Sequence, residues 1–157
     1  MDASKPSILV VDDEMGPRES LKMILNPYYN VHTADRGTQA VEMLKQVPVD
    51  LVTVDLKMPG FSGINVLEKV KQHDPDIEAI IITGYGSLET AITAVRLGAQ
   101  DYLTKPFSLG QVDVILKQAA LAFEKERRRR ADREVVAALT AIEERLASIE
   151  RHLKLRP

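Results

Sequence analysis

The sequence predicts an α/β protein built on a doubly wound, five-stranded parallel sheet. Short apolar runs rich in Ile and Val alternate five times with stretches of helical periodicity, and the connections between them are short. Gly and Pro bound these runs, which is typical of strands buried on both faces of a parallel sheet. Such alternation implies right-handed crossovers, with helices on both faces of the sheet. The 157 residues suffice for one such domain and an appendage.

The expected elements follow one another in a regular order. The strands are expected at residues 8–11, 30–34, 51–54, 79–82 and 101–104. The helices are expected from the turn at Pro17 to about Asn26, over 37–46, 64–72 and 87–97, and from Ser108 onward. Proline suits the first turn of a helix, because its missing N–H has no partner there.

Single residues predict how two of these helices begin and pack. We expect Leu21, Ile24 and Leu25 on the buried face of the first helix, because they recur at helical spacing. Ser87 is a good N-cap for the fourth helix, and Thr90 three residues later makes at best a weak capping box.

Polar groups occur where four of the predicted strands end. Carboxylates follow the first and third strands, a hydroxyl follows the fourth and an amine follows the fifth: Asp12, Asp13, Asp55, Thr83 and Lys105. Any one of these residues alone would commonly start a turn or face solvent. Because parallel strands end at one edge of the sheet, where open α/β sheets place their ligand crevice, we expect all five groups to converge.

The converging groups predict phosphoryl transfer onto a carboxylate. Three carboxylates at close range require a cation, and an oxygen-only site with room for water suits Mg²⁺. Lys105 offers a mobile point charge for a phosphoryl oxygen, and Thr83 offers a hydroxyl donor. Asp55 would act as the nucleophile, while the metal and the ammonium stabilise charge on the transferring oxygens.

The same residues resemble the receiver domain of two-component response regulators. The matching stretches are ILVVDDE at 8–14, VDLKMPG at 54–60, ITG at 82–84 and DYLTKPF at 101–107. The resemblance covers about residues 5–123 and is strongest to receivers that precede σ54-type ATPase activators. The chain contains no Walker A sequence, GxxxxGK[ST], so we do not expect that ATPase in it. The resemblance implies a flavodoxin-like strand order of 2-1-3-4-5.

The resemblance also implies a function and a role for each matching residue. A sensor histidine kinase would phosphorylate Asp55, and the domain would then change conformation to signal. It would be a signalling domain rather than an enzyme, limited to self-catalysed phosphoryl transfer and dephosphorylation at Asp55. The implied roles are Mg²⁺ ligation by Asp12, Asp13, Asp55 and the Lys57 backbone carbonyl, phosphoryl contacts from Thr83 and Lys105, a conformational switch at Thr83 and Tyr102, and a cis peptide between Lys105 and Pro106.

Three other functions are alternatives to the receiver. A phosphatase with an aspartyl nucleophile usually has a second Asp two residues later, where this chain has Lys57. A dinucleotide-binding domain needs a glycine-rich turn after the first strand, where this chain has Asp-Asp-Glu-Met. A receiver-like adaptor would act only by binding another protein. Turnover of a small phosphorylated substrate would distinguish the phosphatase from the receiver.

Residues 124–157 are expected to form a separate helical tail after a receiver domain at 1–123. The tail has ten Lys and Arg against seven Asp and Glu, a net charge of +3. Because acidic residues are interspersed and no helix-turn-helix follows, a solvated helix is favoured over a nucleic-acid patch.

Six apolar residues of the tail then recur at alternating spacings of four and three: Val135, Leu139, Ile142, Leu146, Ile149 and Leu153. This heptad seam predicts a homo-oligomer held by the fifth helix and the tail. An amphipathic helix packed on its own protomer would show the same pattern.

The composition excludes several further classes. The chain has no cysteine, and therefore no disulfide framework, thiolate nucleophile or cysteine-based zinc site. The N-terminal residues lack the apolar core of a signal peptide, and no apolar run approaches the length that spans a membrane. We therefore expect a cytoplasmic protein without membrane contacts.

Overall fold

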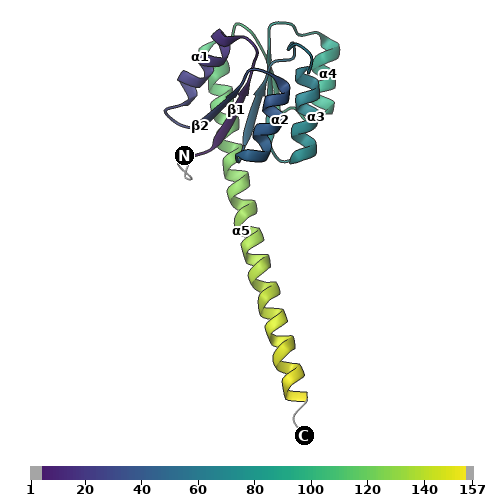
Figure 1. Cartoon of the computed structure of the whole chain (residues 1–157). Helices are drawn as coiled ribbons and strands as arrows, with labels where there is room; N and C mark the ends of the chain where they lie inside the picture. The colour runs from purple at the N-terminus through teal and green to yellow at the C-terminus, as the bar shows by residue number, and fades with distance from the viewer. Residues whose placement is uncertain (1–4, 155–157) are drawn as a thin grey trace. The chain divides into compact units, whose positions relative to one another are not determined.

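Figure 1 shows the computed structural model, which describes residues 5–154 apart from the side chains of Leu109 and Glu126. The chain divides into two compact units, Met1–Phe123 and Glu124–Pro157. The first unit carries the sheet, and the second is the tail.

The first unit contains a five-stranded sheet, and all of its strand pairs are parallel. The strands are β1 (Ser7–Val11), β2 (Asn30–Ala34), β3 (Leu51–Val54), β4 (Glu78–Thr83) and β5 (Asp101–Thr104). Their order is β2-β1-β3-β4-β5, so the predicted fold class and strand order are confirmed. Every residue of β1 and β3 is buried, which explains why all but one residue of each strand is apolar.

Five helices connect or follow the strands. They are α1 (Met15–Leu25), α2 (Gly37–Gln46), α3 (Gly63–His73), α4 (Leu88–Arg96) and α5 (Leu109–Lys154). In the first unit, α1 and the beginning of α5 lie on one side of the sheet, and α2, α3 and α4 lie on the other (Figure 1).

Alternate residues of each strand supply two hydrophobic cores. Leu9 and Val11 of β1 face the core that includes residues of α2 and α3. Ile8 and Val10 face the core that includes Leu21 of α1 and residues of α5. Because side chains alternate across a strand, one apolar run serves both cores.

Two predictions about helices were wrong. Ile24 is exposed, whereas Leu21 and Leu25 are buried, because these two residues stack one turn apart and Ile24 lies about 100° around the helix from Leu25. Ser87 and Thr90 form a complete capping box: each side chain accepts the backbone N–H of the other residue. A threonine hydroxyl therefore takes the place that a Glu or Gln side chain usually fills.

The predicted helix and strand boundaries otherwise differ from the structure by at most two residues. β1 and β4 each begin one residue earlier than expected, and α1 begins at Met15. The turn after β3 depends on Gly60, whose φ of 78° is a left-handed conformation that favours glycine.

The second unit is described from Glu124 to Lys154, and all of these residues are helical. The six predicted heptad residues are each 50–64% exposed. No helix within residues 5–154 is long and apolar enough to cross a membrane.

Candidate functional site

The site residues lie at the carboxyl edge of the sheet, where backbone hydrogen bonds fix the segments that carry them. The N–H of Asp12 donates to the Ala34 carbonyl at 3.1 Å, just beyond the end of β1. The N–H of Asp55 donates to the Val11 carbonyl at 2.9 Å, so the pairing of β3 with β1 continues through the site residue. The parallel sheet therefore aligns both aspartates at one edge.

Three carboxylates meet at this edge. One oxygen from each of Asp12, Asp13 and Asp55 lies within 4.8 Å of the others. Asp12 and Asp55 are buried, whereas Asp13 is exposed. Two acidic side chains are thus enclosed beside a third that solvent can reach, and together they form an acidic cluster.

Lys105 crosses the edge of the sheet to reach this acidic cluster. Its Nζ lies 2.7 Å from an oxygen of Asp12 and 2.8 Å from Oδ2 of Asp55, and its side chain is only 10% exposed. Its backbone N–H donates to the Thr83 carbonyl at 3.0 Å, and its peptide bond to Pro106 is cis. One ammonium therefore bridges the two buried aspartates.

The pKa shifts in the cluster follow from burial and from the opposite charges placed close together. Burial raises the pKa of Asp12, and the charge of Asp55 raises it further, despite the hydrogen bond from Lys105. Burial alone would lower the pKa of Lys105, but hydrogen bonds and charge attraction from Asp12 and Asp55 together raise it. Lys105 therefore stays protonated, and the cluster favours binding of a further cation.

The remaining oxygens of the two buried aspartates accept backbone donors. Oδ1 of Asp12 accepts the N–H of Glu14 at 2.9 Å, and Oδ1 of Asp55 accepts the N–H of Lys57 at 3.2 Å. These bonds hold both carboxylates in fixed orientations.

Thr83 ends β4 at the same edge of the sheet, whereas Tyr102 lies within β5 opposite Ile81. In the described part of the chain, neither hydroxyl hydrogen-bonds to the carboxylates of the cluster. Thr83 is buried, and its Oγ1 accepts the N–H of Tyr85 at 3.2 Å. The Tyr102 hydroxyl lies 3.4 Å from Oγ1 of Thr90 in α4. A Cβ added at Gly86 would overlap the Tyr102 hydroxyl, so the ring is packed against the loop before α4.

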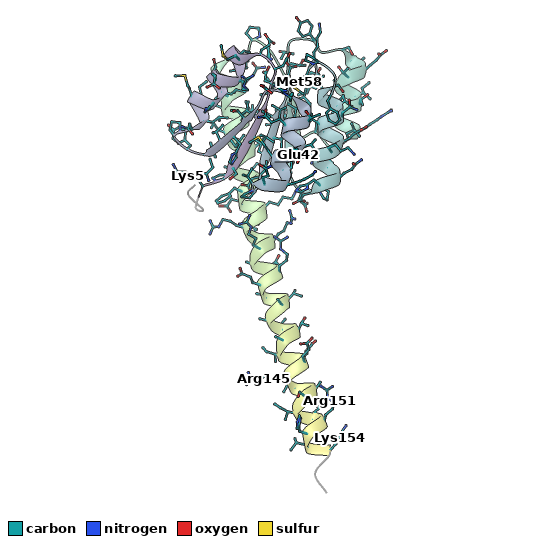
Figure 2. The ribbon with its side chains drawn as sticks, in the orientation of Figure 1. Lys5, Glu42, Met58, Arg145, Arg151 and Lys154 are labelled. Atoms are coloured by element: carbon teal, nitrogen blue, oxygen red, sulfur yellow. The ribbon has the colours of Figure 1, made fainter. Side chains whose placement is uncertain are left out.

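A cleft of about 330 Å³ opens beside the cluster. Asp13, Glu14, Lys57, Met58, Pro59 and Tyr85 line it. The Lys57 ammonium lies 3.8 Å from the centre of the Tyr85 ring, a cation–π contact across the loops that follow β3 and β4. Figure 2 labels Met58 at the end of this unit opposite Lys5, which precedes β1.

Three residues with roles in the site were missed by the reasoning from sequence. Glu14 lies 3.2 Å from the Lys105 ammonium and is the third acidic partner of that lysine. Arg18 donates to the Asp12 carbonyl at 2.7 Å. At Gly63 a Cβ would overlap the carbonyl of Asp55, so α3 begins directly against the site strand. Only Glu14 had a sequence signal, namely its place directly after Asp12 and Asp13.

The donor set fits a hard divalent cation. Mg²⁺ prefers oxygen ligands and retains several waters, so a few carboxylates with solvent access on one side suffice. The acidic cluster supplies such carboxylates, and exposed Asp13 marks the solvent side.

Comparison with known proteins identifies the family. The model of the response regulator receiver domain matches residues 8–117. The chain belongs to this family. Receiver domains of two-component response regulators take phosphate from sensor kinases, so this chain is a signalling domain of that kind.

Similar receivers occur in larger regulators. The chain is 39% identical over 113 residues to the transcriptional regulatory protein ZraR of Escherichia coli K12, covering 71% of this chain and 26% of ZraR. It is 37% identical over 117 residues to the response regulator protein PilR of Pseudomonas aeruginosa, covering 74% of this chain and 26% of PilR. These relatives confirm the expected similarity to receivers of σ54-type activators. The chain spans about a quarter of the length of the curated relatives it matches.

Solved receiver structures share the fold. The CheY-like receiver from Methanospirillum hungatei JF-1 has a TM-score of 0.73 at 28% identity, covering 77% of this chain and 98% of that receiver. The receiver domain of NtrX from Brucella abortus has a TM-score of 0.66 at 31% identity, covering 71% of this chain and 96% of that domain. The receiver fold therefore accounts for most of the first unit.

Proposed function

We propose that Asp55 is the phosphoacceptor of this receiver and that a sensor histidine kinase is its donor. The observation that carries the proposal is the position of the Asp55 carboxylate. It is buried at the end of a central strand, 2.8 Å from the Lys105 ammonium, and shares an acidic cluster with Asp12 and Asp13. A nucleophile, a fixed cationic group and a set of metal ligands are thus present together.

In the proposed reaction, an Asp55 oxygen attacks the phosphorus of a phosphohistidine. The N–P bond breaks, an O–P bond forms, and the departing imidazole takes a proton from solvent. Lys105 stabilises the negative charge on the phosphoryl oxygens, because its ammonium already contacts the Asp55 carboxylate. Thr83 would donate its hydroxyl to a phosphoryl oxygen after releasing the Tyr85 N–H.

We infer that Mg²⁺ is the cofactor, held by Asp12, Asp13, Asp55 and the backbone carbonyl of Lys57. A bound Mg²⁺ would neutralise charge on the phosphoryl oxygens during transfer. This role also accounts for the surplus negative charge of the cluster, which one ammonium does not balance.

Thr83 and Tyr102 are proposed as the switch that transmits phosphorylation to the surface. Thr83 ends β4 beside the site, and Tyr102 in β5 reaches Thr90 of α4. Movement of the Thr83 hydroxyl toward a phosphoryl group would free space on the side where Tyr102 packs. Phosphorylation would then shift the equilibrium between two conformations of the surface formed by α4, β5 and α5.

The domain is proposed to signal rather than to turn over a substrate. Residues 1–123 would be the phosphoacceptor domain, and residues 124–157 a tail that joins copies of the chain, with a dimer favoured over larger assemblies. Lys57 occupies the position where an aspartyl phosphatase has its second Asp, which argues against turnover. Nucleic acid is not a proposed partner, and the cytoplasmic location stays a prediction.

The proposal is tested by phosphoryl uptake from a small phosphodonor, read as intact mass. Wild type should gain one phosphoryl group with Mg²⁺ and little or none with EDTA. Asp55→Asn should lose the uptake. Asp35→Asn is the matched control, because Asp35 follows β2 at the same edge of the sheet and pairs instead with Arg36. Full uptake by Asp55→Asn would refute the assignment, and steady release of phosphate from the donor would favour a phosphatase.

A further inference from the structure

The second unit carries a narrow apolar stripe with no partner in the described chain. This tail stripe consists of Val135, Leu139, Ile142, Leu146, Ile149 and Leu153, each at least half exposed. Its spacing of seven residues per two turns is that of a coiled-coil seam, with leucine at a positions and Val135, Ile142 and Ile149 at d positions. Burying such a stripe against an equivalent stripe would stabilise the helix, because apolar surface is removed from water.

The residues that flank the tail stripe differ in charge on its two sides. The e positions hold Val136, Glu143 and Glu150, and the g positions hold Ala138, Arg145 and His152. One flank is therefore acidic and the other is basic or neutral. In the described part of the chain, Arg145 and Glu150 form no recorded ion pair. Both charges are available to a second helix, and Arg145 projects from the tail helix in Figure 2.

The charges of the two flanks distinguish parallel from antiparallel pairing. In a parallel coiled coil each g residue faces the e residue of the next heptad on the other helix. Arg145 then faces Glu150 of the second copy, and Ala138 faces Glu143, so the facing pairs include opposite charges and no like charges. In an antiparallel coiled coil e faces e and g faces g. In the fully overlapping antiparallel alignment, Glu143 faces Glu143 of the other copy and Arg145 faces Arg145, so like charges meet on both flanks.

We propose that the tails of two copies of this chain pair in parallel and in register along the tail stripe. Identical residues then meet across the seam, and Arg145 pairs with Glu150 of the other copy on both sides. Since residue 124 of each copy lies at the same end of the pair, both phosphoacceptor domains are tethered to that end. This inference rests on the proposed self-association and adds its orientation, register and charge pairing.

Cross-linking tests the orientation without interference, because the natural chain has no cysteine. The full-length variants Leu139→Cys and Ile149→Cys are each treated with a short bis-maleimide. In a second sample the two variants are refolded together before treatment, and one of them carries an isotope label so that mixed dimers can be recognised by mass. The two positions are ten residues apart, roughly 15 Å along a helix, which exceeds the reach of the reagent. In the fully overlapping antiparallel alignment they would instead face each other.

The expected result is a covalent dimer from each variant alone, and no mixed product above the background set by random collision. Mixed products alone would overturn the parallel orientation while leaving self-association intact. A monomer by light scattering at high protein concentration, with no cross-link, would overturn both the seam and the orientation. Neither result would bear on phosphoryl uptake by Asp55, which is measured on the same samples.

Charge exchange tests the pairing of Arg145 with Glu150. Arg145→Glu and Glu150→Arg should each weaken dimerisation severalfold, since each places like charges across the seam. The double exchange should recover most of the loss, because opposite charges face each other again in the parallel arrangement. Glu144→Arg is the matched control at an f position, away from the seam, and should leave dimerisation unchanged. Failure of the double exchange to recover would refute the proposed register.

Discussion

At the scale of single residues, the site concentrates negative charge around one ammonium. Lys105 contacts two buried aspartates and one exposed glutamate, and Asp13 adds a further carboxylate beside them. Isolated buried charges are costly, so each of these residues depends on the others. The arrangement suits a site whose purpose is to receive more positive charge and then a phosphoryl group.

Gly63 packs closely against the backbone of the site strand. Because a Cβ there would overlap the carbonyl of Asp55 and the Cα of Leu56, Gly63→Ala must push α3 away from the site strand. We expect the free energy of unfolding to fall by about 1–3 kcal/mol, with reduced phosphoryl uptake. Urea unfolding and intact mass measure the two effects. Gly16→Ala in α1 is the control: its Cβ would meet nothing within 4 Å, and it should raise stability by roughly 0.5–1 kcal/mol.

His32 in β2 makes stability depend on pH. Its Nε2 is buried without a hydrogen-bond partner among the described residues, and burial lowers the pKa of the ring. As pH falls, the unfolded chain, whose histidine has a pKa of about 6.5, therefore binds a proton before the folded chain does. The free energy of unfolding should decrease as pH falls through and below that value, and the loss should be smaller in His32→Leu. His73→Gln, at an exposed position in α3, should retain the wild-type dependence. Equal slopes in wild type and His32→Leu would contradict this account.

At the scale of elements, β4, α4 and β5 connect the site to the surface. Thr83 ends β4 with its hydroxyl on the loop before α4, and Tyr102 of β5 contacts Thr90 of α4. Leu88, Ile92 and Val95 give α4 an exposed apolar face. We propose that a rearrangement beginning at Thr83 would be carried through these contacts to the exposed face of α4.

Hydrogen exchange measures this transmission directly. With Mg²⁺ and a phosphoryl mimic, amide protection should change across residues 84–115, because the mimic bonds the Thr83 hydroxyl in only one of the two states. Residues 37–54, which include α2 and β3, should change less. Asp55→Asn under the same conditions is the control and should show no change. Unchanged protection across 84–115 in wild type would contradict the proposed switch.

At the scale of the whole molecule, the strand pattern predicts the site as well as the sheet, because topology alone brings the strand ends together. Asp12, Asp55 and Lys105 could be grouped from the sequence, since parallel strands end at one edge. The contact of Glu14 with Lys105 spans 91 residues and depends on side-chain rotamers, which no local pattern encodes. The Lys57–Tyr85 contact likewise depends on side-chain rotamers and could not be predicted from a local pattern. The prediction for Ile24 was wrong because the apolar residues of α1 cover a wider part of the helix surface than the stripe that packs against the sheet.

The tail should determine the size of the assembly in solution. Truncation after Phe123 should lower the mass measured by light scattering by more than the deleted residues account for. The seam is only about three heptads long, which is marginal for an isolated coiled coil, so contacts of the receiver are expected to assist it. Equal association states for the intact and truncated chains would show that the tail does not join the protomers.

The most direct test of the central claim is to locate the phosphoryl group. After incubation with Mg²⁺ and a phosphodonor, borohydride reduces an aspartyl phosphate to homoserine, and peptide mass spectrometry finds the altered residue. The account predicts homoserine at position 55 alone. Homoserine at position 12 or 13, or at another aspartate with position 55 unmodified, would contradict it.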